Sequence, residues 1–343
     1  MFSYSNWAVV TVSFLVVLYL ALGGVTLSAV LHLVGARWRY EIRLLASSLF
    51  ALFPLAFVLL LVLLANGEST FPWLKEMGLK HTGEHAHHIP AWHNYTFLVA
   101  REVIGMLVVM AIHWMFIQRQ AVSERSPKDA VRFHIIACWV PYVYVLYGTM
   151  VAWDFEMTMV PSWESAIYAM QHFVSNFGMF MAFLVIWIFA LNTRDKLVHP
   201  VKPYIYNYLA QMLFAFTLLW VYTFFAQYLT IWYGNLPYER NRMVGMQDGD
   251  YTFIWWAMIV LKFVIPFTLF ALPFTRHNIK ATAAVASCII IGTLFERYVW
   301  VAGVNGTGTY PIVAALVASG VVATIGFFLV RMRLQSIQLV KGN

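Results

Sequence analysis

The stretch "AWDFEMTMVPSWESAIYAMQHF", residues 152–173, places three acids and two tryptophans between two long apolar runs. The acids are Asp154, Glu156 and Glu164, and His172 follows inside the second run. Ionisable side chains are costly inside a membrane, so those that are kept usually face the protein interior and have partners. The fold prediction therefore starts from the apolar runs on either side of this segment.

Composition indicates an integral membrane protein. The chain has 343 residues, of which 62% are hydrophobic and 11% charged, whereas soluble domains carry about 25% charged residues. Its two cysteines, Cys138 and Cys288, are far apart, and no CxxC or CxxCH occurs. We therefore expect no iron–sulfur cluster, c-type haem or zinc knuckle in this chain. The start "MFSYSNW" lacks a basic region, so we expect the first apolar run to be kept as a span rather than removed as a signal peptide.

The apolar runs predict an all-α membrane protein with nine transmembrane helices in a single domain, residues 1–343. Each run reaches the ~20 residues that cross a bilayer, and no strand-like alternation is present. Helices satisfy every backbone polar group inside lipid. The expected spans are 7–34, 44–65, 96–117, 134–153, 164–191, 205–234, 252–273, 281–304 and 310–331.

The charged loops predict the orientation. Lys and Arg gather in cytoplasmic loops, and here fifteen lie in one set of alternate loops against four in the other. The fifteen are Arg37, Arg39, Arg43, Arg119, Arg125, Lys128, Arg132, Arg194, Lys196, Lys202, Arg276, Lys280, Arg331, Arg333 and Lys341. We expect the N-terminus and the loops 66–95, 154–163, 235–251 and 305–309 outside, and the C-terminus inside.

Ionisable and aromatic residues converge at one predicted depth, the outer half of the membrane. Glu164, Tyr168 and His172 are spaced i, i+4, i+8, which places them on one helix face. The whole candidate set comprises Arg101, Glu102, Asp154, Trp163, Tyr168, His172, Tyr228, Trp232, Glu296 and Arg297. Such a set suits a quinone, because oxidation or reduction of the ring moves two protons and needs groups that change protonation.

Roles follow from this chemistry. We expect Asp154 or His172 to be catalytic by exchanging the proton of a ring oxygen. Arg101 and the carboxylates of Glu102 and Glu296 would tune the pKa values of these two groups and relay protons outward. Tyr228 and Trp232 would form the walls around the ring. Neither Asp154 nor His172 has a partner nearby in the sequence, which favours a functional role over a structural one.

Other interpretations remain open. Pairs such as Glu296–Arg297 can simply hold helices together, and aromatic residues near helix ends often form an interfacial belt. Lys262 suits an ion pair, snorkelling or a proton path. No two histidines match in depth and helix for a haem, and "HTGEHAHHIPAWH" (81–93) reads as an exposed histidine loop or a metal site. A solute transporter is disfavoured, because no paired broken helices occur near the midplane.

Three segments carry a resemblance to a known family. "DFEMTMVPSW" (154–163), "QYLTIWYGNLPYE" (227–239) and "HNYTFLVAREVIG" (93–105) resemble segments of the quinone-binding membrane subunits of alternative complex III, within the NrfD-like, polysulfide-reductase-type family. The resemblance spans about residues 90–335. The residues on matching positions are Arg101, Asp154, Trp163, Tyr228, Trp232, Asn235 and Pro237. Phe155 stands where the family usually has Trp, and Tyr238 where it often has an acid.

The resemblance implies two four-helix bundles plus an extra helix, in a bacterial inner membrane. It implies a subunit of a respiratory quinol oxidoreductase complex that binds quinone or quinol near the outer face and has no redox centre of its own. Electrons would pass to iron–sulfur and multihaem cytochrome c subunits, contacted by Glu156, Asn235, Pro237 and Tyr238, and a paralogous membrane subunit would stand beside the chain. We expect no nucleic-acid partner. The alternative is a structural anchor that conducts protons and has no quinone site.

Overall fold

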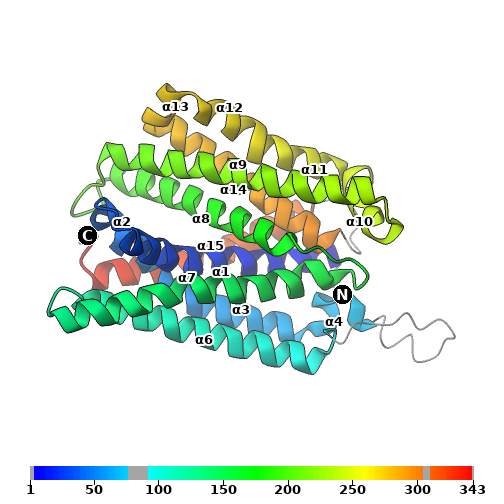
Figure 1. The fold of residues 1–343 in the computed structure, drawn as a ribbon, viewed down its shortest axis with the longest axis horizontal. Helices are drawn as coiled ribbons and strands as arrows, with labels where there is room; N and C mark the ends of the chain where they lie inside the picture. The colour runs from blue at the N-terminus through cyan, green and yellow to red at the C-terminus, as the bar shows by residue number, and fades with distance from the viewer. Residues whose placement is uncertain (1–3, 76–91, 304–309, 342–343) are drawn as a thin grey trace.

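The structure is a computed structural model that describes residues 4–75, 92–303 and 310–341. Within these ranges nine helical segments are long and apolar enough to cross a membrane, and the only pairing of β type is one isolated bridge, Leu197 with Val340. The chain is thus an all-α, multi-pass membrane protein, as its composition predicts (Figure 1).

The helices run nearly parallel or antiparallel between two ends (Figure 1). In chain order they are α1 (Tyr4–Leu33), α2 (Arg39–Ser47), the 3-10 helix η1 (Ser48–Leu52), α3 (Phe53–Ala65), α4 (Gly67–Thr70), α6 (Tyr95–Val122), α7 (Pro127–Phe155), the 3-10 helix η2 (Met157–Met159), α8 (Tyr168–Thr193), α9 (Pro203–Gly234), α10 (Pro237–Gln247), α11 (Thr252–Ile259), the π-helix η3 (Val260–Val264), α12 (Ile265–Ala271), α13 (Pro273–His277), α14 (Ile279–Ala302) and α15 (Ile312–Ser336). We call the end with the N-terminus, α4 and α10 the N-face, and the end with α13 and the end of α15 the C-face.

The spans pack as two groups of four with one helix added. One group contains α1, α3, α6 and α7, and the other contains α8, α9, the α11–α12 segment and α14. The last helix, α15, leans on α1 and η1. This is the arrangement of two four-helix bundles and an extra helix that the resemblance implies.

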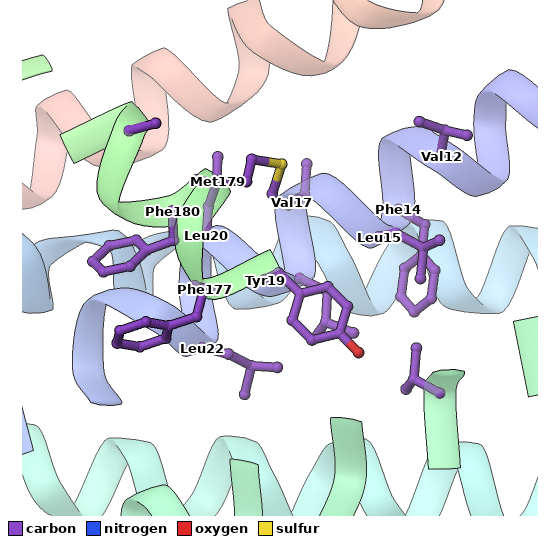
Figure 2. Close-up of a cluster of buried hydrophobic side chains, with 14 of the residues drawn as sticks. Val12, Phe14, Leu15, Val17, Tyr19, Leu20, Leu22, Phe177, Met179 and Phe180 are labelled. Carbon is purple, nitrogen blue, oxygen red and sulfur yellow. The ribbon is translucent and has the colours of Figure 1, made fainter. Parts of the chain in front are cut away.

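Helix α1 also packs against α8 and α14 of the other group and is buried on nearly all sides, as expected of a helix that is apolar all round. Figure 2 shows part of its core, where side chains of α1 pack with Phe177, Met179 and Phe180 of α8. Close approach depends on glycine: a Cβ on Gly24 would lie 2.2 Å from the backbone oxygen of Ala46. This contact brings α2 directly against α1.

Two prolines change the helix type inside spans. Pro54 lacks the N–H that would bond to Phe50, and the preceding residues form the 3-10 turn η1. Pro266 likewise releases the carbonyl of Lys262, and the chain widens into the π-helix η3 at that point. Because π-turns often occur at functional sites, the position of Lys262 within η3 matters below.

Two boundaries differ from expectation near the N-face. The fifth span begins at Tyr168 rather than at residue 164, so Glu164 lies in an exposed loop and does not share a helix face with His172. The reason is Trp163, whose side chain is 1% exposed and packs on Tyr168 and Trp300. Burying this ring holds the preceding loop against the bundle. The expected loop 235–251 contains a further helix, α10.

Candidate functional site

Eight of the buried ionisable side chains lie where α6, the end of α7, α8, η3 and α14 meet, between the N-face and the middle of the bundle. They are Arg101, Glu102, Asp154, Glu156, His172, Lys262, Glu296 and Arg297. A buried charge is tolerated only when it is paired and hydrogen-bonded. The contacts divide these residues into two clusters, which the sequence placed in a single pocket.

The first cluster consists of Arg101, Glu102 and Asp154, with Trp92. Arg101 holds Asp154 in a bidentate pair, with Nε–Oδ2 at 2.7 Å and Nη2–Oδ1 at 2.5 Å. The Trp92 indole donates to Asp154 Oδ1 at 2.7 Å, and Arg101 Nη1 donates to the Trp92 carbonyl at 3.1 Å. Asp154, which had no partner nearby in the sequence, is therefore fully paired through residues 53 and 62 positions away.

Glu102 is the unbalanced member of the first cluster. Its side chain is fully buried beside Asp154 and Tyr147, and neither carboxylate oxygen has a hydrogen bond of ordinary geometry with the described residues. Two carboxyl groups thus share one guanidinium. Binding one proton would balance the charge of the cluster, so Glu102 is the group of the first cluster that is suited to hold a proton.

The second cluster is centred on Glu156 and Arg297. Glu156 Oε2 accepts from Arg297 Nη1 at 2.5 Å and lies 2.7 Å from His172 Nδ1. The hydroxyl of Tyr168 donates to the same oxygen. His172 is 1% exposed and also lies 2.5 Å from Arg297 Nη1. Tyr168 and His172, which were predicted to share a helix face, thus both contact the Glu156 carboxylate.

Arg297 joins this carboxylate to a second one. Its Nη2 forms an ion pair with Glu296 Oε1 at 3.0 Å, and this oxygen accepts a hydrogen bond from Trp220 Nε1 at 3.0 Å. Glu296 Oε2 accepts from Ser175 Oγ at 2.5 Å and from Lys262 Nζ. With neutral His172, two carboxylates face two cations, so the second cluster is balanced and a proton on His172 would add a charge.

Lys262 enters the cluster from the π-helix η3. Its helix begins at Thr252, ten residues earlier, which places it ~15 Å along the span from the N-face end. It approaches α14 at Gly292, where a Cβ would lie 2.5 Å from Lys262 Cγ. The missing side chain at Gly292, one turn before Glu296, therefore makes room for the lysine stem.

Two tyrosines lie between the clusters. Tyr147 is buried near Glu102, Asp154 and Tyr19. The ring of Tyr19 lies 5.0 Å from that of His172, and its hydroxyl donates to the Gly148 carbonyl at 3.2 Å. The ionisable groups therefore form one continuous band across the bundle, from α6 to η3.

Arg242 of α10 closes the second cluster on the N-face. It donates to the carbonyls of Glu156 at 2.7 Å and Trp300 at 3.2 Å, and its guanidinium lies over the rings of Trp163 and Trp300. Burial lowers the pKa of Arg242 to about 10, so it stays charged at neutral pH. In the sequence analysis Arg242 was only one of the four basic residues in the loops expected outside.

Glu156 is placed differently from the prediction. We expected it at a surface that contacts a partner protein, but its side chain is 0% exposed and its carboxylate is bound inside the second cluster. The chain leaves the α7 helix at this residue, with φ −135° and ψ −56°, and the side chain turns inward. This expected partner contact was wrong.

The aromatic walls are also placed differently. Trp232 is 66% exposed on the outside of α9, and the Tyr228 hydroxyl donates to Gln247 of α10 at 3.1 Å. Within the described residues, neither forms a hydrogen bond or ring contact with a member of the clusters. The residues proposed for partner contact, Asn235, Pro237 and Tyr238, do lie exposed at the N-face end of α9 and the start of α10.

Several site residues were not expected from the sequence. Trp92, Ser175 and Trp220 bind the carboxylates directly. One sequence signal was present: Ser175 follows His172 by three residues, on the same face of α8. Of the histidine loop, residues 81–91 lie outside the described part of the chain. Its last histidine, His93, is buried and lies 3.1 Å from the Thr158 carbonyl.

Fold and site together define a multi-pass helical membrane protein with a band of buried, mutually paired charges near one face. Comparison with protein-family models and with curated proteins gives no match for this chain.

Proposed function

We propose that the chain is the membrane subunit of a respiratory quinol oxidoreductase complex of the alternative complex III type, in the NrfD-like family. It binds quinol or quinone at its N-face end and exchanges protons with it through the buried band. The bound quinol supplies two electrons and two protons when it is oxidised. The observation that carries the proposal is the surplus carboxyl group of the first cluster, buried beside one Arg–Asp pair.

The headgroup binds beside the first cluster, where aromatic rings reach the surface. Trp92 contacts Phe97 and Trp153 with ring centroids 5.9 and 5.6 Å apart. Phe97 is 50% exposed, whereas the Arg101 side chain behind these rings is only 6% exposed. A flat ring stacks well on such a wall. This position replaces the wall first expected from Tyr228 and Trp232.

Protons leave the headgroup through Glu102, the carboxyl group of the first cluster that Arg101 does not bind. A carboxylate that accepts a proton there balances its charge against Arg101. From Glu102 the buried groups continue through Tyr147 and Tyr19 towards His172, and a proton that reached the second cluster would have to move on, because that cluster is already balanced. Asp154 is a positioning residue, because its pair with Arg101 fixes both groups.

The partners and the orientation are part of the same proposal. The excess of Lys and Arg on the C-face loops favours a cytoplasmic C-face and an outward N-face in a bacterial inner membrane. Iron–sulfur and multihaem cytochrome c subunits would dock at the N-face near Asn235, Pro237 and Tyr238, and take the electrons. A paralogous membrane subunit would complete the complex.

One observation favours the second candidate, a structural anchor that conducts protons without a quinone site. The hollow beside the second cluster, lined by Ser175, Trp220 and Lys262, holds about 10 Å³. That is room for about one water molecule and not for a ring. The second cluster therefore suits proton transfer alone, and the distinction between the two candidates depends on the first cluster.

The substitution Glu102→Gln tests the proposal. It keeps the side-chain volume and removes the titrating group, and it leaves the Arg101–Asp154 pair intact. Asp154→Asn is a poorer test, because it would leave a buried arginine unpaired. In the purified complex, Glu102→Gln should lower quinol turnover with an artificial electron acceptor by about 10²–10⁴-fold.

Glu164→Gln, in the exposed loop on the same face, is the matched control and should turn over at the wild-type rate. Partner subunits must co-purify in both variants. If Glu102→Gln turns over quinol like the wild type while the complex remains assembled, the quinone proposal is wrong and the anchor function takes its place.

A further inference from the structure

A second feature of the molecule lies away from the buried charges. A cavity of about 750 Å³ runs along α15, between α15 and the helices α1, α8 and α14. This volume is within the 300–1,000 Å³ usual for ligand sites. Its walls are mostly apolar and include Val12, Leu20, Phe183, Leu294, Val322 and Phe327. The cavity therefore suits a hydrocarbon ligand.

The cavity is long enough for a lipid chain. On α15 its lining extends from Ser319 to Gln335, 16 residues apart, or ~24 Å along the helix. Half the hydrocarbon core of a bilayer is only ~15 Å thick. An extended acyl chain can thus lie lengthwise against α15 from the C-face inward.

The C-face end of the cavity is cationic. Arg194, Lys196, Arg331 and Lys341 line it, and no acidic residue is among the described lining residues. The end is also held in place by the backbone: the Lys341 N–H donates to the Lys196 carbonyl at 2.8 Å. Asp195, outside the lining, pairs with Lys341 at 2.6 Å. Three of the four cations thus have no acidic partner within salt-bridge distance in the described residues.

We propose that this cavity is a binding site for an anionic phospholipid. The acyl chain lies along α15, and the phosphate is bound by the cations at the C-face. Basic pockets between transmembrane helices on the cytoplasmic side bind acidic lipid headgroups in this way. An isoprenoid quinone carries no charge, so four cations at one end of the cavity do not favour it.

The test uses the purified full chain, reconstituted into nanodiscs with equal amounts of phosphatidylglycerol and phosphatidylethanolamine of the same acyl chains. Lipids that stay bound after extraction into mild detergent are counted by mass spectrometry. The wild type should retain phosphatidylglycerol preferentially. The double variant Lys196→Gln/Arg331→Gln should lose that preference at least tenfold, while Arg333→Gln, next to the cavity but not in its lining, should keep it.

A second pair of variants tests the chain-binding part. Ala323→Phe places a ring in the cavity and should abolish the retained phosphatidylglycerol, while Thr324→Phe, on the neighbouring position outside the lining, should not. Equal retention of both lipids by the wild type overturns the proposal. Unchanged retention of phosphatidylglycerol by Ala323→Phe also overturns the proposal. So does the finding that Ala323→Phe loses a bound quinone instead of the phospholipid.

Discussion

At the residue scale, Glu156 shows how strongly one buried carboxylate depends on its neighbours. It binds Arg297 at 2.5 Å, His172 at 2.7 Å and the Tyr168 hydroxyl. Removing one partner of a buried ion pair leaves the other charge uncompensated, at a cost of about 3–5 kcal/mol. We therefore expect Glu156→Gln to lower the free energy of unfolding by that amount, measured by denaturant titration in detergent.

Glu164→Gln provides the comparison, because Glu164 lies exposed only eight positions further along the chain. Exposed substitutions usually change stability by no more than about 0.5 kcal/mol. Equal stability of Glu156→Gln and Glu164→Gln would contradict the buried position of Glu156 and indicate that Glu156 lies at the surface.

At the element scale, the approach of α14 to η3 depends on Gly292. An alanine there would place its Cβ 2.5 Å from Lys262 Cγ and 3.0 Å from Leu261 Cβ. The lysine would have to move, which would strain its pair with Glu296. Overpacking of this kind costs about 1–3 kcal/mol, so Gly292→Ala should lower the thermal unfolding temperature.

Gly320→Ala is the matched control on α15, since nothing lies within 4 Å of its Cβ position. Replacing a helical glycine by alanine in open space should stabilise the protein by about 0.5–1 kcal/mol. The two variants should therefore shift the unfolding temperature in opposite directions. If both raised the unfolding temperature, η3 and α14 would be further apart than described.

At the scale of the whole molecule, the two faces differ in charge. Arg37 lies on the C-face and Glu239, in α10, on the N-face. We expect an outward N-face, because fifteen Lys and Arg occupy the opposite loops. In a chain with Cys138→Ser and Cys288→Ser, a membrane-impermeant maleimide applied to intact spheroplasts should label Glu239→Cys and leave Arg37→Cys unlabelled.

Permeabilised membranes serve as the control for this experiment, since both positions should then react. Labelling of Arg37→Cys alone in intact spheroplasts would reverse the orientation. It would also place the buried charge band near the cytoplasm, so that the proposed electron-accepting subunits on the outer side could not reach the proposed quinol site.

The sequence by itself determined the class of protein. Nine apolar runs predict nine spans, and the structure has nine candidate spans in the described residues. The physical reason is that lipid offers no hydrogen-bond partners, so each backbone N–H and C=O must bond within its own helix. The length and apolarity of a run are therefore enough to predict a transmembrane helix. The sequence also indicated which charged residues lie deep, because a charge kept inside an apolar run must face the protein.

Only the tertiary structure decided which of these residues meet. Asp154 and Glu156 are two positions apart, yet Asp154 pairs with Arg101 of α6 and Glu156 with Arg297 of α14. Such choices depend on how each helix is rotated and where it ends, which apolar composition does not specify. The same holds for Lys262, whose path to Glu296 exists because a proline widens its helix and Gly292 leaves space opposite. Pairing partners are long-range contacts, and packing fixes them.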